Sequence, residues 1–378
     1  MRRTGINRAA AALALVAAGG LLSSSPATAR ERELRLNQIQ VIGTHNSYHV
    51  EASPIEEAAR AQVDPIGELA LEYGHPALTQ QFSDEAVRQI ELDVFADPAG
   101  GLYAAPLIRA LTGEGPYDPA MAQPGFKVLH LQDIDYRSTC LTLASCLTEL
   151  KTWSDGHRSH VPIAVLIELK DDPLVLPGAP PLVTPVPWTG PLMDQLDAQI
   201  RSVFPPRRLI TPDAVRDGAR TLEAAVRHEG WPSIADSRGK VMFLMDNAGS
   251  YRTTYLAGHP SLRGRVLFTN SRPGQPDAAF VEENDPTGAH QAQIAEEVRQ
   301  GYLVRTRADA DTVQARTGDT SQRDAALASG AQWVSTDYPV PGIAARFGTS
   351  YVAQLPGGVT VRCNPISAPD RCRAPAHP

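Results

Sequence analysis

The sequence predicts an α/β fold, a single (β/α)8 barrel of the TIM type with long loops on its C-terminal face. Eight short runs of apolar, β-forming residues recur along the chain, and helical patterns lie between several of them. This alternation of strand and helix is typical of parallel βα units, and eight such units favour a closed barrel. The runs span residues 39–43, 87–95, 126–131, 162–170, 240–246, 265–270, 302–307 and 332–337.

The helical patterns support this prediction. Leu196, Ile200 and Val203 form one apolar stripe before the fifth run, and Gly301 and Gly330 stand where glycines end helices before the last two. The runs are continuously apolar, as expected for strands that are covered on both faces. A doubly wound open sheet is the alternative. No G-x-G-x-x-G motif follows the first run, which removes the commonest reason to prefer that fold.

The beginning of the chain has the pattern of a secretory signal peptide. Three arginines precede an apolar stretch, which leads to the small-residue cleavage pattern Ala-Thr-Ala at residues 27–29. The apolar stretch is too short for a comfortable membrane span. We therefore expect a signal peptide over residues 1–29, a secreted mature protein, and one domain over residues 30–378.

The charge of the chain limits its partners. The formal net charge is −7, and loss of the three arginines with the leader makes it more negative by three. A protein of this charge has no general attraction to nucleic acid or to an anionic membrane.

Four cysteines fall as two local pairs, which in an exported protein indicate disulfides. Four cysteines allow three pairings, and sequence proximity favours Cys140 with Cys146 and Cys363 with Cys372. A zinc site is disfavoured because neither pair has the tight C-x-x-C spacing.

Ionisable side chains stand at the ends of consecutive predicted strands. Because side chains alternate along a strand, Glu91 and Asp93 of "IELDV" share one face of the second strand. Glu168 and Lys170 of "IELKD" share one face of the fourth strand in the same way. Each acid alone would be weak evidence, since an acid at a strand end often caps the next helix. Their repetition at successive strand ends predicts a functional site.

Two histidines join this group. His45 and Asn46 follow the first strand in "VIGTHNSYHV", and His130 ends the third strand in "VLHLQ". The C-terminal ends of barrel strands form the face on which active sites are built, and long loops follow several of these strands. We therefore expect these residues to converge with the carboxylates at the mouth of the barrel.

Three carboxylates and an amide oxygen in one place would repel one another unless a positive charge lay among them. A hard divalent cation is the simplest solution, and Ca²⁺ accepts six to eight oxygen ligands. Asn46, Glu91, Asp93 and Glu168 are the candidate ligands. Zinc is less favoured, because the histidines would then be ligands and no acid or base would remain. Ion pairs with Lys170 or an arginine are the structural alternative.

These segments resemble those of a known family. "GTHNSY", "ELDVF", the histidine of "LHL" and "IELK" are similar to the catalytic segments of the phosphoinositide phospholipase C superfamily, most closely its secreted, Ca²⁺-dependent actinobacterial branch. The resemblance implies that His45 and His130 are the catalytic pair and that Lys170 contacts the substrate phosphate. It also implies that the ligands of Ca²⁺ are the four residues named above.

Other readings remain open. Glycerophosphodiester phosphodiesterases share the "E-x-D" and "IE-x-K" patterns, but they have His-Arg-Gly where this chain has His-Asn-Ser from His45 onward. A catalytically silent Ca²⁺-dependent module that binds a lipid or glycan head group is a further alternative. Arg305 and Arg307 share a face of the seventh strand, where they either bind phosphate or inositol hydroxyls or form structural ion pairs. Asp246 is either an extra ligand or a helix cap, and the cap is favoured.

The resemblance implies an enzyme that cleaves phosphatidylinositol to diacylglycerol and an inositol phosphate, with a cyclic phosphate as a conceivable first product. An inositol hydroxyl already lies beside the phosphate, so the enzyme mainly moves protons and neutralises charge. We expect a monomer that binds no nucleic acid. We also expect a transient contact with the membrane surface. The sequence does not reveal its mode, because no amphipathic helix with a basic face is visible.

Overall fold

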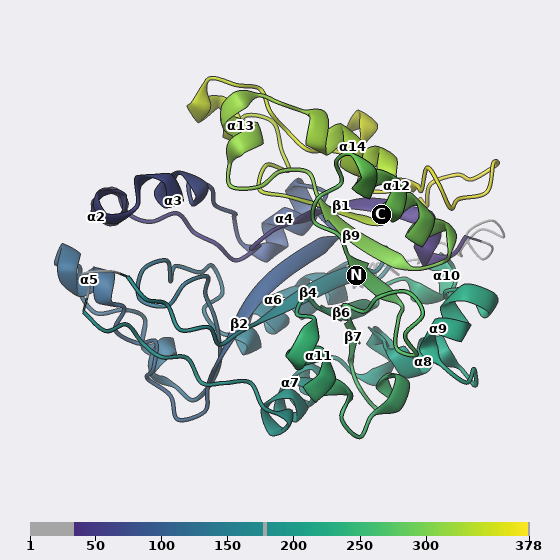
Figure 1. Ribbon diagram of the computed structural model, residues 1–378, viewed down its shortest axis with the longest axis horizontal. Coiled ribbons are helices and arrows are strands. Elements are labelled where there is room, and N and C mark those ends of the chain that lie inside the picture. The colour runs from purple at the N-terminus through teal and green to yellow at the C-terminus, as the bar shows by residue number, and fades with distance from the viewer. Residues whose placement is uncertain (1–33, 177–179, 377–378) are drawn as a thin grey trace, which may run out of the picture.

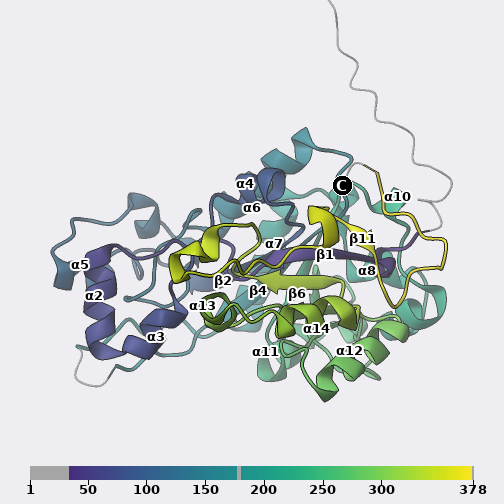
Figure 2. The ribbon, with the colours of Figure 1, turned by 90° about the horizontal axis from the view of Figure 1, so that it is seen from above.

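The computed structural model describes residues 34–176 and 180–376, and the expected signal peptide lies outside them. Within these residues a curled parallel sheet forms the centre of the molecule, and helices surround it (Figures 1 and 2). Parallel pairings connect the strands in the order β7-β6-β4-β2-β1-β10-β9-β8, and a bridge between Asn270 and Phe280 links β7 to β8. The predicted TIM-type barrel is therefore confirmed.

The strands of the barrel are β1 (Ile39–Thr44), β2 (Gln89–Asp97), β4 (Ile163–Lys170), β6 (Val241–Met245), β7 (Leu267–Thr269), β8 (Phe280–Glu282), β9 (Leu303–Arg307) and β10 (Trp333–Thr336). Three further strands pair beside them: β3 (Gly125–Val128), β5 (Leu209–Ile210) and β11 (Arg362–Cys363).

One predicted strand has a different role from the one expected. The run at residues 126–131 contributes β3, which pairs antiparallel with the end of β2 and lies outside the parallel barrel. His130 therefore follows an antiparallel strand, not a strand of the barrel. The missing barrel strand is β8, which the sequence did not reveal because three residues carry too little periodic pattern to stand out.

Helices follow most of the strands. They are α2 (Pro54–Val63), α3 (Pro65–Ala70), α4 (Leu78–Asp84), α5 (Leu107–Thr112), α6 (Leu143–Gly156), α7 (Gly190–Val203), α8 (Pro212–Arg216), α9 (Leu222–Ala224), α10 (Ile234–Ser237), α11 (Gly249–Leu256), α12 (Ala289–Arg299), α13 (Val313–Thr317) and α14 (Ser321–Ser329). Short 3-10 helices lie at Leu36–Gln38, Pro119–Ala122, Pro206–Arg208, Pro260–Leu262, Ile343–Phe347 and Pro356–Gly358, and a π-helical turn at Ala225–Glu229. Among the described residues, no helix is both long and apolar enough to cross a bilayer.

Alternation along β2 separates the apolar core from the interior of the barrel. Ile90, Leu92 and Val94 are completely buried in the core between the sheet and the helices. Glu91 and Asp93 point to the other side, into the barrel, where they are also buried. The same strand thus supplies a hydrophobic face that holds the fold together and a charged face that is available for chemistry.

Both predicted disulfides are present, between Cys140 and Cys146 and between Cys363 and Cys372. The first joins the segment between β3 and α6 to the beginning of α6. The second starts at the last residue of β11, which pairs antiparallel with Ile39 and Gln40 at the start of β1.

The helices after the first two barrel strands form a projection at one side of the barrel. In both views α2, α3 and α5 lie together, away from the other helices (Figures 1 and 2). We call these three helices, with residues 174–176 of the loop after β4, the α2–α5 lobe. Because its segments follow β1, β2 and β4, the lobe belongs to the C-terminal face of the barrel.

Candidate active site

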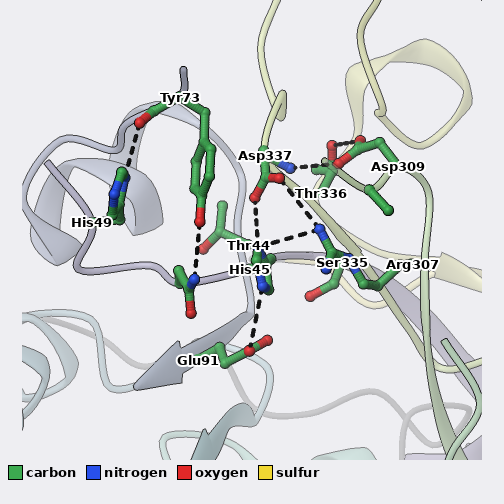
Figure 3. A network of polar contacts seen from close by, with 12 residues as sticks. Thr44, His45, His49, Tyr73, Glu91, Arg307, Asp309, Ser335, Thr336 and Asp337 are labelled. Carbon is green, nitrogen blue, oxygen red and sulfur yellow. Dashed lines mark hydrogen bonds and ion pairs between the residues drawn. The ribbon is translucent and has the colours of Figure 1, made fainter. Parts of the chain in front are cut away.

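His45 lies directly after β1, between a carboxylate above it and one below it (Figure 3). Its Nδ1 is 2.9 Å from Oδ1 of Asp337, the residue after β10. Its Nε2 lies 3.8 Å from Oε1 of Glu91 on β2. Since a carboxylate only accepts hydrogen bonds, Nδ1 of His45 carries the proton and donates to Asp337, which leaves Nε2 as the basic nitrogen.

The surroundings keep His45 neutral. Burial lowers the pKa of its imidazole well below the usual value, and the positive charges of Arg307 and Arg305 lower it further. A neutral imidazole with a free Nε2 is the form that can accept a proton.

Asn46 turns the chain sharply after the strand. Its φ is 43°, a left-handed conformation that asparagine tolerates better than most residues. Its Nδ2 donates to the Tyr73 hydroxyl at 2.9 Å, and the Tyr48 hydroxyl donates to its Oδ1 at 3.4 Å. Tyr48 lies in the field of Asp93 and Glu168, which add to the effect of burial in raising the pKa of its phenol. The two tyrosines thus fix the position of the Asn46 amide.

His130 is oriented by a separate buried carboxylate. Its Nδ1 is 2.7 Å from Oδ2 of Asp135, so Nδ1 donates and Nε2 is left free. Asp135 also accepts hydrogen bonds from Nε2 of His49 at 2.9 Å and from Arg60 at 2.9 Å. Burial raises the pKa of Asp135, but the charge of His49 and the hydrogen bonds of both histidines outweigh it and hold this pKa well below its usual value.

A chain of aromatic rings connects the two histidines. The ring of Tyr73 lies 5.9 Å from that of His45 and stacks at 4.5 Å on that of His49. His49 in turn meets the edge of His130 at 6.0 Å. Tyr73 and His49 therefore occupy the space between the two catalytic candidates, and they fix the separation of the two rings by packing.

Three carboxylates gather below His45. Ligand atoms of Glu91, Asp93 and Glu168 all lie within 4.8 Å of one another. Burial, followed by the charge of Glu168, raises the pKa of Asp93 well above its usual value. Burial also raises the pKa of Glu91 to about 7, although Arg305 opposes this shift. Lys170 lies 3.0 Å from Glu168 and 3.4 Å from Asp93, so it compensates part of the charge of these two carboxylates.

This group fits a hard divalent cation. Asp93 is completely buried, yet neither of its carboxylate oxygens has a hydrogen-bond partner. A buried polar atom without a partner is costly, and a cation with oxygen ligands would remove that cost. A second set of potential ligands, His49, His130 and Asp135, is already joined by hydrogen bonds, so it has no such need.

The two arginines of β9 differ in their surroundings. Arg305 is buried and forms ion pairs with Glu91 and with Glu282 of β8, so its guanidinium takes the structural role left open by the sequence. The Nη2 atom of Arg307 lies 3.3 Å from both His45 Nδ1 and Asp337 Oδ2, and its side chain is 13% exposed. Arg307 is therefore the arginine that borders the site.

The interpretation of Asp246 as a helix cap is wrong. The next helix, α11, begins only at Gly249, and its N-cap residue is Ala248 with no side-chain cap. The carboxyl group of Asp246 lies instead beside Glu282, and burial followed by the charge of Glu282 raises its pKa well above the usual value. Asp246 belongs to the acidic interior of the barrel.

A family model and several solved structures match this chain. The model of the family described as "Phosphoinositide phospholipase C, Ca2+-dependent" matches residues 34–365. The chain belongs to this family. It is therefore a phospholipase C enzyme by family, and the match favours this assignment over a glycerophosphodiester phosphodiesterase. A search of curated proteins finds no match.

Solved structures of phospholipases C share the fold. The calcium-dependent phosphoinositol-specific enzyme from a Pseudomonas species is 16% identical, with a TM-score of 0.53 over 89% of this chain and 98% of its own. Its complex with myo-inositol gives a TM-score of 0.54 over 90% and 100%. The Ca²⁺-dependent phosphatidylinositol-specific enzyme from Streptomyces antibioticus is 18% identical, with a TM-score of 0.50 over 81% and 95%.

Several residues of this site were not predicted from the sequence. Asp337 is the last residue of the eighth predicted run and directly follows β10, so the rule that identified the other acids applies to it as well. Tyr73, His49 and Asp135 lie in loops, outside any periodic pattern. Only their hydrogen bonds to site residues reveal them.

Proposed function

We propose that this protein cleaves phosphatidylinositol at the bond between phosphate and diacylglycerol, with His45 as general base and His130 as general acid. One observation carries the proposal. Each histidine is held through Nδ1 by a buried carboxylate, which leaves Nε2 of each free to exchange a proton. Family membership supplies the substrate class.

The chemistry needs two proton transfers. Nε2 of His45 accepts the proton of the inositol hydroxyl beside the phosphate as that oxygen forms its bond to phosphorus. His130 gives a proton to the glycerol oxygen as the bond between phosphorus and that oxygen breaks. The products are diacylglycerol and a cyclic inositol phosphate, which a water molecule can then open with the two histidines in exchanged roles.

Glu91, Asp93 and Glu168 would hold Ca²⁺, with the amide oxygen of Asn46 as a further ligand. When bound there, this cation would supply positive charge to the phosphoryl oxygens. Lys170, which pairs with Asp93 and Glu168, would add a second positive charge at the phosphate. Arg307 keeps His45 neutral and is placed to contact the phosphate or the inositol ring, whereas Arg305 mainly holds Glu91 in position.

The α2–α5 lobe would make the transient contact with the membrane. Large apolar residues are exposed on it: Ile55 (53%), Val63 (61%), Ile66 (79%), Leu111 (66%) and Val175 (80%). Exposed apolar residues gathered next to an active site often mark a surface for a protein or a membrane. Two disulfides also support secretion, because such bonds persist in oxidising compartments.

The test is to measure turnover of phosphatidylinositol, phosphatidylcholine and simple glycerophosphodiesters, each with added Ca²⁺ and with excess EGTA. Cleavage of phosphatidylinositol alone, abolished by EGTA and restored by Ca²⁺, is expected. Preferred cleavage of glycerophosphodiesters, or tight head-group binding without any turnover, would contradict the proposal. Phosphorus NMR of the products separates a cyclic phosphate from an open one.

A further inference from the structure

The α2–α5 lobe encloses a cavity of about 290 Å³. Its wall is mainly apolar: Leu107 and Leu111 come from α5, Leu174 and Leu176 from the loop after β4, and α2 and α3 form the opposite side. Val63 and Leu111 are both lining residues and largely exposed, so they stand at the entrance. An apolar cavity of this kind, open to solvent, suits a hydrocarbon ligand.

The cavity begins next to the proposed general acid. Leu131 and Ile134 belong to its wall, and they lie in the same turn as His130 and Asp135. Leu131 and Asp135 close this turn with two backbone hydrogen bonds of 2.9 and 3.0 Å. Arg60, which binds Asp135, also lines the cavity. The turn beside the proposed general acid thus also forms part of the wall of the cavity.

This shared turn indicates which part of the substrate the cavity would bind. His130 protonates the oxygen of the leaving group, so the glycerol of that group must lie against the turn that contains His130. Its acyl chains are the nearest apolar part of the substrate, and the nearest apolar wall is that of the cavity.

We propose that the cavity binds one acyl chain of the diacylglycerol leaving group. This inference rests on the proposed function and adds a recognition site for the lipid portion of the substrate. The volume corresponds to roughly ten methylene groups, if each takes the ~30 Å³ that a water molecule occupies in the liquid. One chain therefore fits, and the second remains outside.

The first experiment uses substrates that are dissolved as monomers, so that no membrane takes part. Turnover is measured for the deacylated inositol phosphodiester and for the dibutanoyl and dihexanoyl forms of phosphatidylinositol, each below its critical micelle concentration. Two more buried methylenes in one chain should raise kcat/KM by roughly tenfold from the dibutanoyl to the dihexanoyl form. Equal kcat/KM values for all three substrates would overturn the acyl site.

The second experiment fills the cavity. Ala59 on α2 lines it, whereas the adjacent Ala58 is exposed and does not. Ala59→Phe should reduce the ratio of kcat/KM between dihexanoyl and deacylated substrates by at least fivefold, and Ala58→Phe should keep the wild-type ratio. Unchanged ratios in both variants, or equal losses in both, would contradict the inference.

A third measurement uses the wild-type enzyme, so it tests the acyl site even if Ala59→Phe does not fold. Monomeric 1-octanoylglycerol should inhibit turnover of the dihexanoyl substrate competitively. Turnover that 1-octanoylglycerol does not change would refute the acyl site.

The turnover measurements also separate this inference from the proposed function. If the protein cleaves no inositol phosphodiester, both the proposed function and the acyl site are refuted. If it cleaves these substrates at rates that do not depend on their acyl chains, only the acyl site is refuted. A dependence on acyl-chain length that is seen only with vesicles would mean that the α2–α5 lobe contacts the bilayer surface instead.

Discussion

Asp93 on β2 stands directly opposite Glu168 on β4 in the register of the parallel sheet. Neighbouring side chains at one register position point to the same side of a sheet, so two carboxylates share one small volume inside the barrel. Lys170 opposes their charge from nearby. The fold thus holds together two like charges that would separate in an unconstrained chain.

Asp93→Asn should therefore weaken Ca²⁺ binding and activity and, at the same time, stabilise the Ca²⁺-free protein. The loss in Ca²⁺ affinity should exceed the ~10-fold typical for removal of an outer partner of a metal site. Stability without Ca²⁺ should rise by about 1 kcal/mol, because a buried carboxylate without hydrogen bonds is removed. Calorimetric Ca²⁺ titration and thermal unfolding in EGTA measure the two effects. Asp155→Asn, at a surface ion pair on α6, is the control. A less stable Ca²⁺-free Asp93→Asn protein would contradict this account.

Asp337→Asn should lower kcat on phosphatidylinositol by about 10² to 10⁴ with little change in KM. The amide can turn its NH2 group toward Nδ1 of His45, which then holds the wrong tautomer and no longer presents a basic Nε2. Steady-state kinetics on the variant and on Asp319→Asn, at an exposed loop position, checks this. A change confined to KM would mean that Asp337 acts on substrate binding and not on His45.

The two histidines should differ in their response to the leaving group. His45→Ala and His130→Ala should each lose at least ~10² in rate on phosphatidylinositol. A substrate whose leaving group is a nitrophenol needs no proton on departure, so it should restore turnover in His130→Ala and not in His45→Ala. If the nitrophenol substrate restored turnover only in His45→Ala, His45 would be the general acid and His130 the general base. Residual rates above about a tenth of wild type in both variants would exclude two-histidine catalysis.

Stability should fall between pH 5 and pH 8 because of two buried glutamates away from the site. Burial raises the pKa of Glu85 to about 7, with a smaller effect of Asp84, and burial raises that of Glu297 to about 7 as well. Both pKa values are higher in the folded than in the unfolded chain. The stability gained from protonation is therefore complete below about pH 4.5 and is lost as the pH rises through 7.

Glu85→Gln and Glu297→Gln should each flatten this part of the curve of melting temperature against pH, and the double variant should flatten it most. Urea unfolding at pH 5, 6, 7 and 8 provides the same comparison as free energies of unfolding. Curves for the double variant that run parallel to wild type would show that other groups cause the slope.

Vesicle binding should depend on the exposed apolar residues of the α2–α5 lobe. Ile66→Ser and Val175→Ser each remove a largely exposed apolar side chain, and each should weaken sedimentation with phosphatidylinositol vesicles several-fold. Val359→Ser, at an exposed position outside the lobe, should bind like wild type. Equal binding by all four proteins would show that another surface meets the membrane.

The period-two alternation of the strands made part of the site predictable. Alternation in "IELDV" and "IELKD" placed Glu91, Asp93 and Glu168 on interior faces, and the register of the sheet brings these three together. The barrel fold also followed from pattern, because parallel strands that are covered on both faces are continuously apolar.

Features set by tertiary pairing were not predictable in this way. The strand β3 has the same local composition as a barrel strand. Only its antiparallel pairing with β2 distinguishes it. The support of His130 by Asp135 and His49 depends on two loops that meet in space. The environment of Asp246 depends on Glu282, which lies far along the chain on a strand of three residues.

The pairing of β11 with the first residues of β1 has a practical consequence for handling the enzyme. Ile39 and Gln40 begin β1, whereas the candidate active site lies beyond the last residue of β1. The strand β11 and the disulfide of its Cys363 therefore lie at the opposite end of the barrel. An affinity handle, a fluorophore or a solid support joined after residue 376 would therefore face away from the substrate. Immobilisation through that end should leave lipid access to the mouth open, while attachment to α2 or α5 should obstruct it.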